Sequence, residues 1–166
     1  MKDTETIYFA AGCFWGAQEF FRQFEGVIRT EVGYANGPTP DPTYQEVCSD
    51  SGHAETVRID YDPDVITPSE LIDRFLMVVD PFSVNKQGVD VGIQYRSGIY
   101  YTKNSQKTAA EEKLAEVSKN SGKKTAVEVL PLENFYTAEE YHQDYLKKNP
   151  GGYCHIPKRM MHLEES

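Results

Sequence analysis

The chain has 166 residues and a formal net charge of −9, with 26 acidic and 17 basic side chains. A chain of this length can bury a core of its own, and its acidic balance argues against a protein that binds nucleic acid through a basic face. No run of about 18 apolar residues predicts a transmembrane helix, and residues 1–5 are too charged for a secretory signal. We expect one cytoplasmic domain over residues 1–166, working as a monomer and without a membrane.

Apolar and alternating segments predict strands at residues 6–10, 28–34, 54–61, 98–102 and 126–130, and helices at 13–24, 68–79, 105–120 and 138–148. Thr67-Pro68-Ser69-Glu70 is typical of a capping box with proline in the first turn. Thr137-Ala138-Glu139-Glu140 predicts a second capping box, and Gly122 predicts a helix end. Strands that alternate with helices indicate an α/β (α+β) fold, a two-layer sandwich of a mixed sheet with helices.

Three long segments, 35–52, 80–97 and 149–166, contain no predicted element. Loops of this length in a compact domain are usually functional or disordered. The first two contain aromatic residues such as Tyr44 and Tyr95, which disordered segments usually lack, so we expect ordered loops that build a site. The third is expected to be an irregular C-terminal tail, in which Cys154 follows two glycines and could be a mobile thiol.

The most informative feature is Gly12-Cys13-Phe14-Trp15-Gly16, which directly follows the first predicted strand. At a helix N-terminus, backbone N–H groups and the helix dipole stabilise a thiolate, so we expect Cys13 to have a lowered pKa. Phe14 belongs to an apolar stripe at helical spacing and could lie in the core or beside the thiol. Trp15 lies off that stripe, which favours a pocket wall over simple packing beneath a loop.

A second candidate is Glu55, in the strand at 54–61. Alternation puts Glu55 on the same face as Val57 and Ile59, which should face the core. Burial raises the pKa of a carboxyl group, and an acid that keeps its proton near neutral pH can act as a general acid. A structural carboxylate paired with an arginine or with backbone N–H groups fits the same pattern. Alternation alone leaves both possibilities open.

The other polar residues are weaker candidates. Tyr44 and Tyr95 could donate hydrogen bonds into a site, although most of the 11 tyrosines are expected only to pack. Cys48 follows alternating apolar residues and is expected to be an inert buried thiol. The sequence has no C-x-x-C pair, and its four histidines have no ligand spacing with one another or with the cysteines, so we expect no bound metal.

Five motifs in chain order make this sequence resemble the peptide-methionine (S)-S-oxide reductases, the A-type methionine sulfoxide reductases (MsrA family). The motifs are Gly12-Cys13-Phe14-Trp15-Gly16, Pro42-Thr43-Tyr44-Gln45-Glu46-Val47-Cys48, Gly52-His53-Ala54-Glu55, Gln94-Tyr95-Arg96-Ser97 and Tyr141-His142-Gln143-Asp144-Tyr145. One such match could be chance, whereas five in the right order over nearly the whole chain are very specific. The resemblance implies a two-layer α/β sandwich related to the ferredoxin-like plait.

The resemblance also implies a thiol-dependent oxidoreductase that reduces methionine-S-sulfoxide, free or in proteins. It makes Cys13 the nucleophile that becomes a sulfenic acid, Glu55 the acid that protonates the sulfoxide oxygen, and Cys154 the thiol that resolves Cys13 as a disulfide. The substrate-binding residues that it implies are Phe14, Trp15, Tyr44, Tyr95, Asp90 and His142. Thioredoxin or a similar dithiol would reduce the disulfide, without a cofactor, and Cys48 would take no part.

The chain departs from the family pattern at two places. Gly88-Val89-Asp90-Val91-Gly92-Ile93 is more apolar than the usual G-N-D-x-G-T, because Val89 replaces an amide and Ile93 a hydroxyl. These changes bear on local hydrogen bonds and on substrate preference. Some relatives have two resolving cysteines in the tail and others have none, whereas this chain has Cys154 alone.

Two other functions would use part of the same pattern. A thiol peroxidase or general disulfide oxidoreductase could use the cysteines on peroxide or glutathione, although the aromatic residues beside Cys13 favour a methyl-sized group. A non-catalytic module that binds oxidised methionine would keep Phe14 and Trp15. Such a module would have no use for an inward Glu55 or a mobile Cys154.

Overall fold

The computed structural model describes residues 4–49, 51–87, 90–154 and 156–165, and its centre is a six-stranded sheet. The strands are β1 (Glu5–Ala11), β2 (Val27–Ala35), β3 (Ala54–Tyr61), β6 (Ser97–Tyr101), β7 (Glu128–Pro131) and β8 (Phe135–Thr137). Their spatial order is β7-β6-β1-β3-β2-β8. Neighbouring strands are antiparallel except β6 and β7, which are parallel, so the sheet is mixed as predicted.

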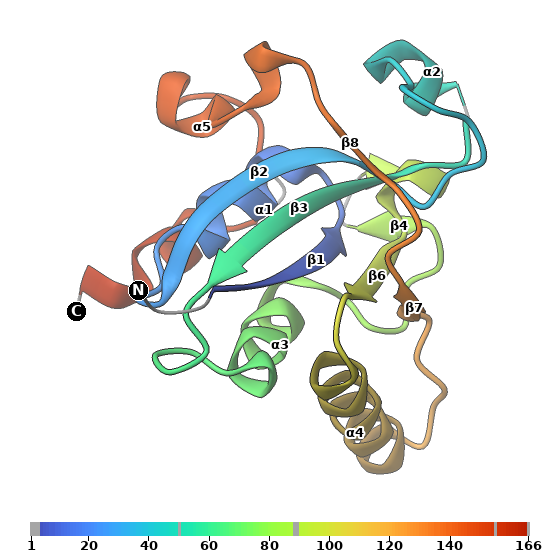
Figure 1. Ribbon diagram of the computed structural model, residues 1–166, viewed down its shortest axis with the longest axis vertical. Helices are drawn as coiled ribbons and strands as arrows, with labels where there is room; N and C mark the ends of the chain where they lie inside the picture. The colour runs from blue at the N-terminus through green and yellow to red at the C-terminus, as the bar shows by residue number, and fades with distance from the viewer. Residues whose placement is uncertain (1–3, 50, 88–89, 155, 166) are drawn as a thin grey trace.

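Three helices pack on one face of this sheet: α1 (Phe14–Phe21), α3 (Pro68–Val78) and α4 (Asn104–Ser121). Alternation along β1 sends Ile7 and Phe9 into the core beneath the helices, whereas Tyr8 and Ala10 join a smaller cluster on the other face. In Figure 1 α1 lies behind β2 and β3, and α3 lies beside α4. The predicted two-layer sandwich is therefore confirmed.

The order of the central strands brings the two main candidate residues to the same end of two neighbouring strands. The chain runs β1-α1-β2-β3-α3-β6, and β3 lies between β1 and β2. This is the split βαβ arrangement of a ferredoxin-like plait. Phe9 of β1 pairs with Val57 of β3. Cys13, just beyond the end of β1, and Glu55, at the start of β3, therefore lie at the same end of these two strands.

Several local predictions are confirmed. The Thr67 hydroxyl accepts a hydrogen bond from the Glu70 N–H at 3.1 Å, and the Glu70 carboxylate accepts one from the Thr67 N–H, which completes the capping box of α3. Gly122 ends α4 with φ 70°, a left-handed conformation that glycine adopts without strain. The first helix is shorter than predicted, because α1 ends at Phe21 and not at residue 24.

The predicted helix over residues 138–148 is wrong. This part of the chain follows β8 with a 3-10 helix, η2 (Glu140–His142), and a short helix, α5 (Tyr145–Lys148). The Thr137 hydroxyl donates to the Glu31 carboxylate at 2.8 Å, so it does not cap a helix. The segment stays paired with the edge of β2 at the next residue, where the Ala138 N–H donates to the Val32 carbonyl at 2.9 Å. Asp144 then adopts φ 52°, which interrupts any continuous helix.

The long segments contain short elements that the sequence analysis did not predict. They are α2 (Tyr44–Cys48), the hairpin strands β4 (Lys86–Gln87) and β5 (Asp90–Val91), and the 3-10 helices η1 (Ile93–Tyr95) and η3 (Lys158–Glu165). A capping box between Thr43 and Glu46 starts α2. In the tail, Ile156 is buried in the main core. Among the described residues, no helix combines the length and the apolarity needed to cross a bilayer.

Candidate active site

Cys13 lies where β1 ends and α1 begins, and it is the N-cap residue of α1. It is only 7% exposed. Burial raises the pKa of its thiol most, and Glu55 raises it further, whereas the N–H groups of Trp15 and Gly16 lower it. The net pKa is well above the ordinary value for cysteine. The prediction of a lowered pKa is therefore wrong, and Cys13 is a thiol in this structure.

Glu55 is buried beside the start of α1 and is 1% exposed. Its Oε1 accepts a hydrogen bond from the Phe14 backbone N–H at 3.1 Å. Burial outweighs this hydrogen bond and raises the pKa of Glu55 to about 8, so the group is a neutral acid at pH 7. Because Oε1 is an acceptor, the acidic proton belongs on Oε2, which has no hydrogen-bond partner among the described residues.

Trp15 forms one wall of the site with residues from the end of the chain. Its indole N–H donates to His142 Nδ1 at 2.9 Å, and its ring stacks on Tyr145 with 3.8 Å between centroids. Burial lowers the pKa of His142, so the ring is neutral with its proton on Nε2. The buried Phe14 ring lies 5.1 Å from His142. The Trp15 side chain thus packs α1 against the η2–α5 segment, and Phe14 belongs to both the core and the site.

The other predicted site residues gather around Glu55. Burial raises the pKa of the Tyr44 and Tyr95 hydroxyls, and the nearby Glu55 carboxyl raises both further. Both phenols therefore keep their protons and can donate hydrogen bonds. Cys13 and Asp90 also raise the pKa of Tyr95. The centroid of the Tyr44 ring lies 4.5 Å from that of His142. The structure thus brings residues from β3, α2, β5, η1 and η2 to one place beside Cys13.

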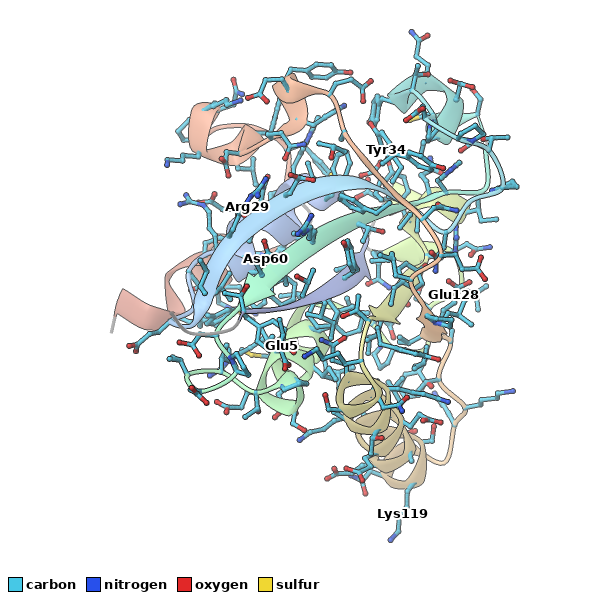
Figure 2. All side chains as sticks on the ribbon, viewed as in Figure 1. Glu5, Arg29, Tyr34, Asp60, Lys119 and Glu128 are labelled. Atoms are coloured by element: carbon cyan, nitrogen blue, oxygen red, sulfur yellow. The ribbon has the colours of Figure 1, made fainter. Side chains whose placement is uncertain are left out.

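The sequence analysis missed Glu139, which connects this site to the sheet. Its Oε1 accepts a hydrogen bond from the Tyr34 hydroxyl at 2.8 Å, and its Oε2 accepts one from the Tyr44 backbone N–H at 3.1 Å. Tyr34 of β2 pairs with Tyr136 of β8, and Figure 2 shows Tyr34 at the end of β2 that lies beside β8. The signal in the sequence is the acidic pair Glu139-Glu140, but the spacing from Thr137 predicts a helix cap there and not a site residue.

All three cysteines are free thiols. Cys48 is exposed in α2, contrary to the expected buried thiol, and the Tyr44 hydroxyl lies within its hydrogen-bonding reach. The Cys154 thiol is half-buried and donates to the Ile156 carbonyl at 3.3 Å. Within the described ranges, no group of three or more His, Cys, Asp or Glu residues is arranged to hold a metal ion.

Comparison with known proteins places this arrangement in a family. The family model for peptide methionine sulfoxide reductase matches residues 5–165. The peptide methionine sulfoxide reductase MsrA of Lachnoclostridium phytofermentans is 54% identical over 153 residues, which cover 92% of each chain. This chain belongs to the peptide methionine sulfoxide reductase family.

Solved structures of this reductase family share the fold. Methionine sulfoxide reductase A of Corynebacterium diphtheriae has a TM-score of 0.85 and 40% identity, covering 93% of this chain and 84% of that one. Mxr1 of Saccharomyces cerevisiae in its reduced form has a TM-score of 0.84 and 40% identity, covering 93% and 92%. Mxr1 has also been solved in complex with Trx2; that structure has a TM-score of 0.56 and 26% identity, covering 87% and 88%.

One of the two apolar replacements in the segment 88–93, Ile93, lies among the described residues. Val89 lies outside the described residues. Ile93 opens η1, two residues before Tyr95, and is 36% exposed, and Val91 of β5 is more exposed still. His155, one of the histidines considered as a ligand, also lies outside the described residues. The described residues that follow Asp90 therefore include two exposed apolar side chains, Val91 and Ile93.

Proposed function

We propose that this chain reduces methionine-S-sulfoxide, free or in proteins, with Cys13 as nucleophile and Glu55 as general acid. One observation carries the proposal: Glu55 is a buried acid with a pKa of about 8, whose proton belongs on an oxygen that has no hydrogen-bond partner among the described residues and lies beside the cysteine. A sulfoxide S–O bond breaks readily only when its oxygen becomes a hydroxyl. An acid held in its neutral form supplies that proton at physiological pH.

In the first step the Cys13 sulfur attacks the sulfoxide sulfur while Glu55 Oε2 gives its proton to the oxygen. The oxygen passes to Cys13, methionine leaves, and the cysteine becomes a sulfenic acid. The thiol proton of Cys13 returns to Glu55, so one thiol and one sulfoxide give one sulfenic acid and one thioether. Tyr44 and Tyr95 donate hydrogen bonds to the oxygen, and Phe14 and Trp15 enclose the methyl group, with Asp90 and His142 on the same wall.

In the second step the Cys154 thiol attacks the Cys13 sulfenic acid, which forms a Cys13–Cys154 disulfide and releases water. Thioredoxin or a similar dithiol then reduces the disulfide by exchange. The solved complex of the relative Mxr1 with Trx2 supports this assignment of the reductant. The cycle needs an external thiol and no metal or organic cofactor.

We also infer that the protein works in the cytoplasm as a monomer, without nucleic acid or membrane partners. The free state of all three cysteines agrees with a reducing compartment. The net charge of −9 opposes contact with the phosphates of nucleic acids and with anionic lipid surfaces.

The test is reduction of the separate S and R epimers of N-acetyl-methionine sulfoxide, followed by chromatography. With dithiothreitol as reductant, the wild type should reduce the S epimer and Cys13→Ser should reduce neither. With thioredoxin, Cys154→Ser should release about one methionine per chain and then stop, since its sulfenic acid has no resolving thiol. Reduction of neither epimer by the wild type would overturn the proposed function, and normal thioredoxin turnover of Cys154→Ser would overturn the role of Cys154.

A further inference from the structure

Tyr153, the residue before Cys154, reaches into the site although no role has been assigned to it. Its hydroxyl donates to Asp90 Oδ2 at 2.9 Å. Burial and this hydrogen bond raise the pKa of Tyr153, with smaller contributions from Cys13 and Cys154. Tyr153 thus lies within electrostatic range of both thiols that must combine in the second step.

The Cys154 thiol has contacts other than those of Tyr153. Its thiol donates to the Ile156 carbonyl at 3.3 Å and lines a pocket of about 280 Å³ beside Glu19 and Met161. Neither Cys13 nor Tyr153 is among the described residues that line this pocket. In the reduced protein, therefore, the Tyr153 hydroxyl donates to Asp90, while the neighbouring Cys154 thiol lines a pocket whose described lining does not include Cys13.

The backbone on both sides of this pair is anchored. Gly152 lies so close to α5 that a Cβ there would be 2.9 Å from the Tyr145 ring, and its N–H donates to the Asn149 carbonyl at 2.8 Å. After Cys154, Ile156 is 3% exposed in the core. Gln23 of the α1–β2 connection then donates to the Met160 carbonyl at 2.7 Å. Of the described residues between these anchors, Tyr153 and Cys154 are the ones that must turn for Cys154 to reach Cys13.

We propose that the Tyr153–Asp90 hydrogen bond, here called the latch, holds Cys154 back from Cys13 until the sulfoxide has been reduced. Tyr153 is then a positioning residue for the resolving step, an inference that rests on the proposed role of Cys154. Closure converts a Cys13 sulfenic acid and a Cys154 thiol into one disulfide and one water. For that bond to form, Tyr153 must leave Asp90 as Cys154 turns out of its pocket.

The test measures how the Cys13 sulfenic acid is partitioned between two fates. Reduced protein receives one equivalent of S-epimer substrate together with dimedone, which traps sulfenic acids covalently. Mass spectrometry then gives the ratio of Cys13–Cys154 disulfide to dimedone adduct. This ratio depends on the rate of closure and not on the rate of the first step. Rapid-quench measurement of methionine release reports that first step separately.

Tyr153→Phe removes the hydroxyl and keeps the ring. Because one exposed hydrogen bond to a carboxylate is lost, we expect the ratio of disulfide to adduct to rise about three- to tenfold, with methionine release unchanged. Tyr101→Phe, which removes a hydroxyl from β6, is the matched control and should leave the ratio at the wild-type value. A purely structural role for Tyr153 would slow both steps and would not raise this ratio.

A ratio in Tyr153→Phe that is unchanged, or shifted toward the adduct, would overturn the latch while leaving the proposed function intact. A wild-type protein that releases methionine but forms no Cys13–Cys154 disulfide would overturn both the latch and the proposed role of Cys154. A wild type that releases no methionine would overturn the proposed function itself. The three failures are therefore distinguishable in one experiment.

Discussion

At the scale of single residues, burial decides the protonation of the two central groups. A helix N-terminus typically stabilises a charge by about 0.3–1 kcal/mol. Full burial can shift a pKa by about 3–5 units, each worth about 1.4 kcal/mol. Burial therefore prevails at Cys13, whose thiol pKa is raised despite its position at the start of α1. The same effect keeps Glu55 protonated, which is the state that a general acid requires.

The pH dependence of the first turnover tests the state of Glu55. With a pKa of about 8, raised by burial, Glu55 is protonated below that pH and loses its proton above it. Because the thiolate is the nucleophile and the pKa of Cys13 is higher still, the rate of methionine release should rise with pH up to about 8 and level off above it, where loss of the Glu55 proton offsets the growing thiolate fraction. Rapid-quench measurements between pH 6 and pH 10, with the S-epimer substrate, would check this.

Glu55→Gln should slow the first turnover by about 10²–10⁴-fold and remove the levelling above about pH 8, because an amide has no acidic proton to lose. Glu112→Gln, an exposed position on α4, is the matched control and should behave as wild type. If Glu55→Gln kept both the rate and the levelling at high pH, another group would be the acid.

At the scale of elements, the segment from β8 to α5 completes the site. Its edge pairing with β2 replaces the helix that the sequence predicts and turns Glu139, His142 and Tyr145 toward α1 and α2. Pairing with β2 is favoured over a helix because it supplies hydrogen-bond partners to N–H and C=O groups of β2 that a surface helix would leave to solvent.

Replacement of Glu139 tests this connection. Glu139→Gln leaves one acceptor oxygen for the two hydrogen bonds from Tyr34 and Tyr44, so α2 and the Tyr44 phenol lose an anchor. Since a hydrogen bond to a charged group is worth about 1.5–3 kcal/mol, we expect kcat/KM for the S-epimer substrate to fall about tenfold.

The neighbouring acid offers a matched control for this measurement. The Glu140 side chain is 91% exposed and its nearest ion-pair partner, Lys148, is 3.7 Å away. Glu140→Gln should therefore leave kcat/KM unchanged. Equal values for the two variants would show that Glu139 does not position Tyr44.

At the scale of the whole molecule, one core joins the sheet to the helices on its inner face. Phe9 of β1 lies at its centre, with ring centroids 5.1 Å from Phe21 of α1 and 5.0 Å from Phe75 of α3. It is completely buried. The core therefore fixes α1 on the sheet, and with it the position of Cys13 relative to Glu55.

Truncation of this residue measures how much stability the core supplies. Phe9→Ala should lower the free energy of unfolding by about 3–5 kcal/mol, through lost burial and a cavity. Ile28→Ala, at a position on β2 that is 58% exposed, should change it by less than about 0.5 kcal/mol. Urea denaturation of the reduced proteins checks both values, and equal destabilisation by the two variants would contradict the central place of Phe9.

The sequence by itself determined whatever depends on neighbours along the chain. Apolar periodicity predicted the central strands and helices, the Thr67–Glu70 spacing predicted a cap, and alternation turned Glu55 inward. Five motifs were enough to indicate the family. These features survive because local backbone geometry and side-chain direction follow from a few adjacent residues.

Only the tertiary structure decided the protonation states and the contacts between distant segments. The raised pKa of Cys13 depends on how much protein covers it, and the partners of Glu139 and Tyr153 lie far away in sequence. Edge pairing with β2 overrode the helical pattern at 138–148 for the same reason. Desolvation and long-range hydrogen bonds are properties of the assembled core, so no local pattern encodes them.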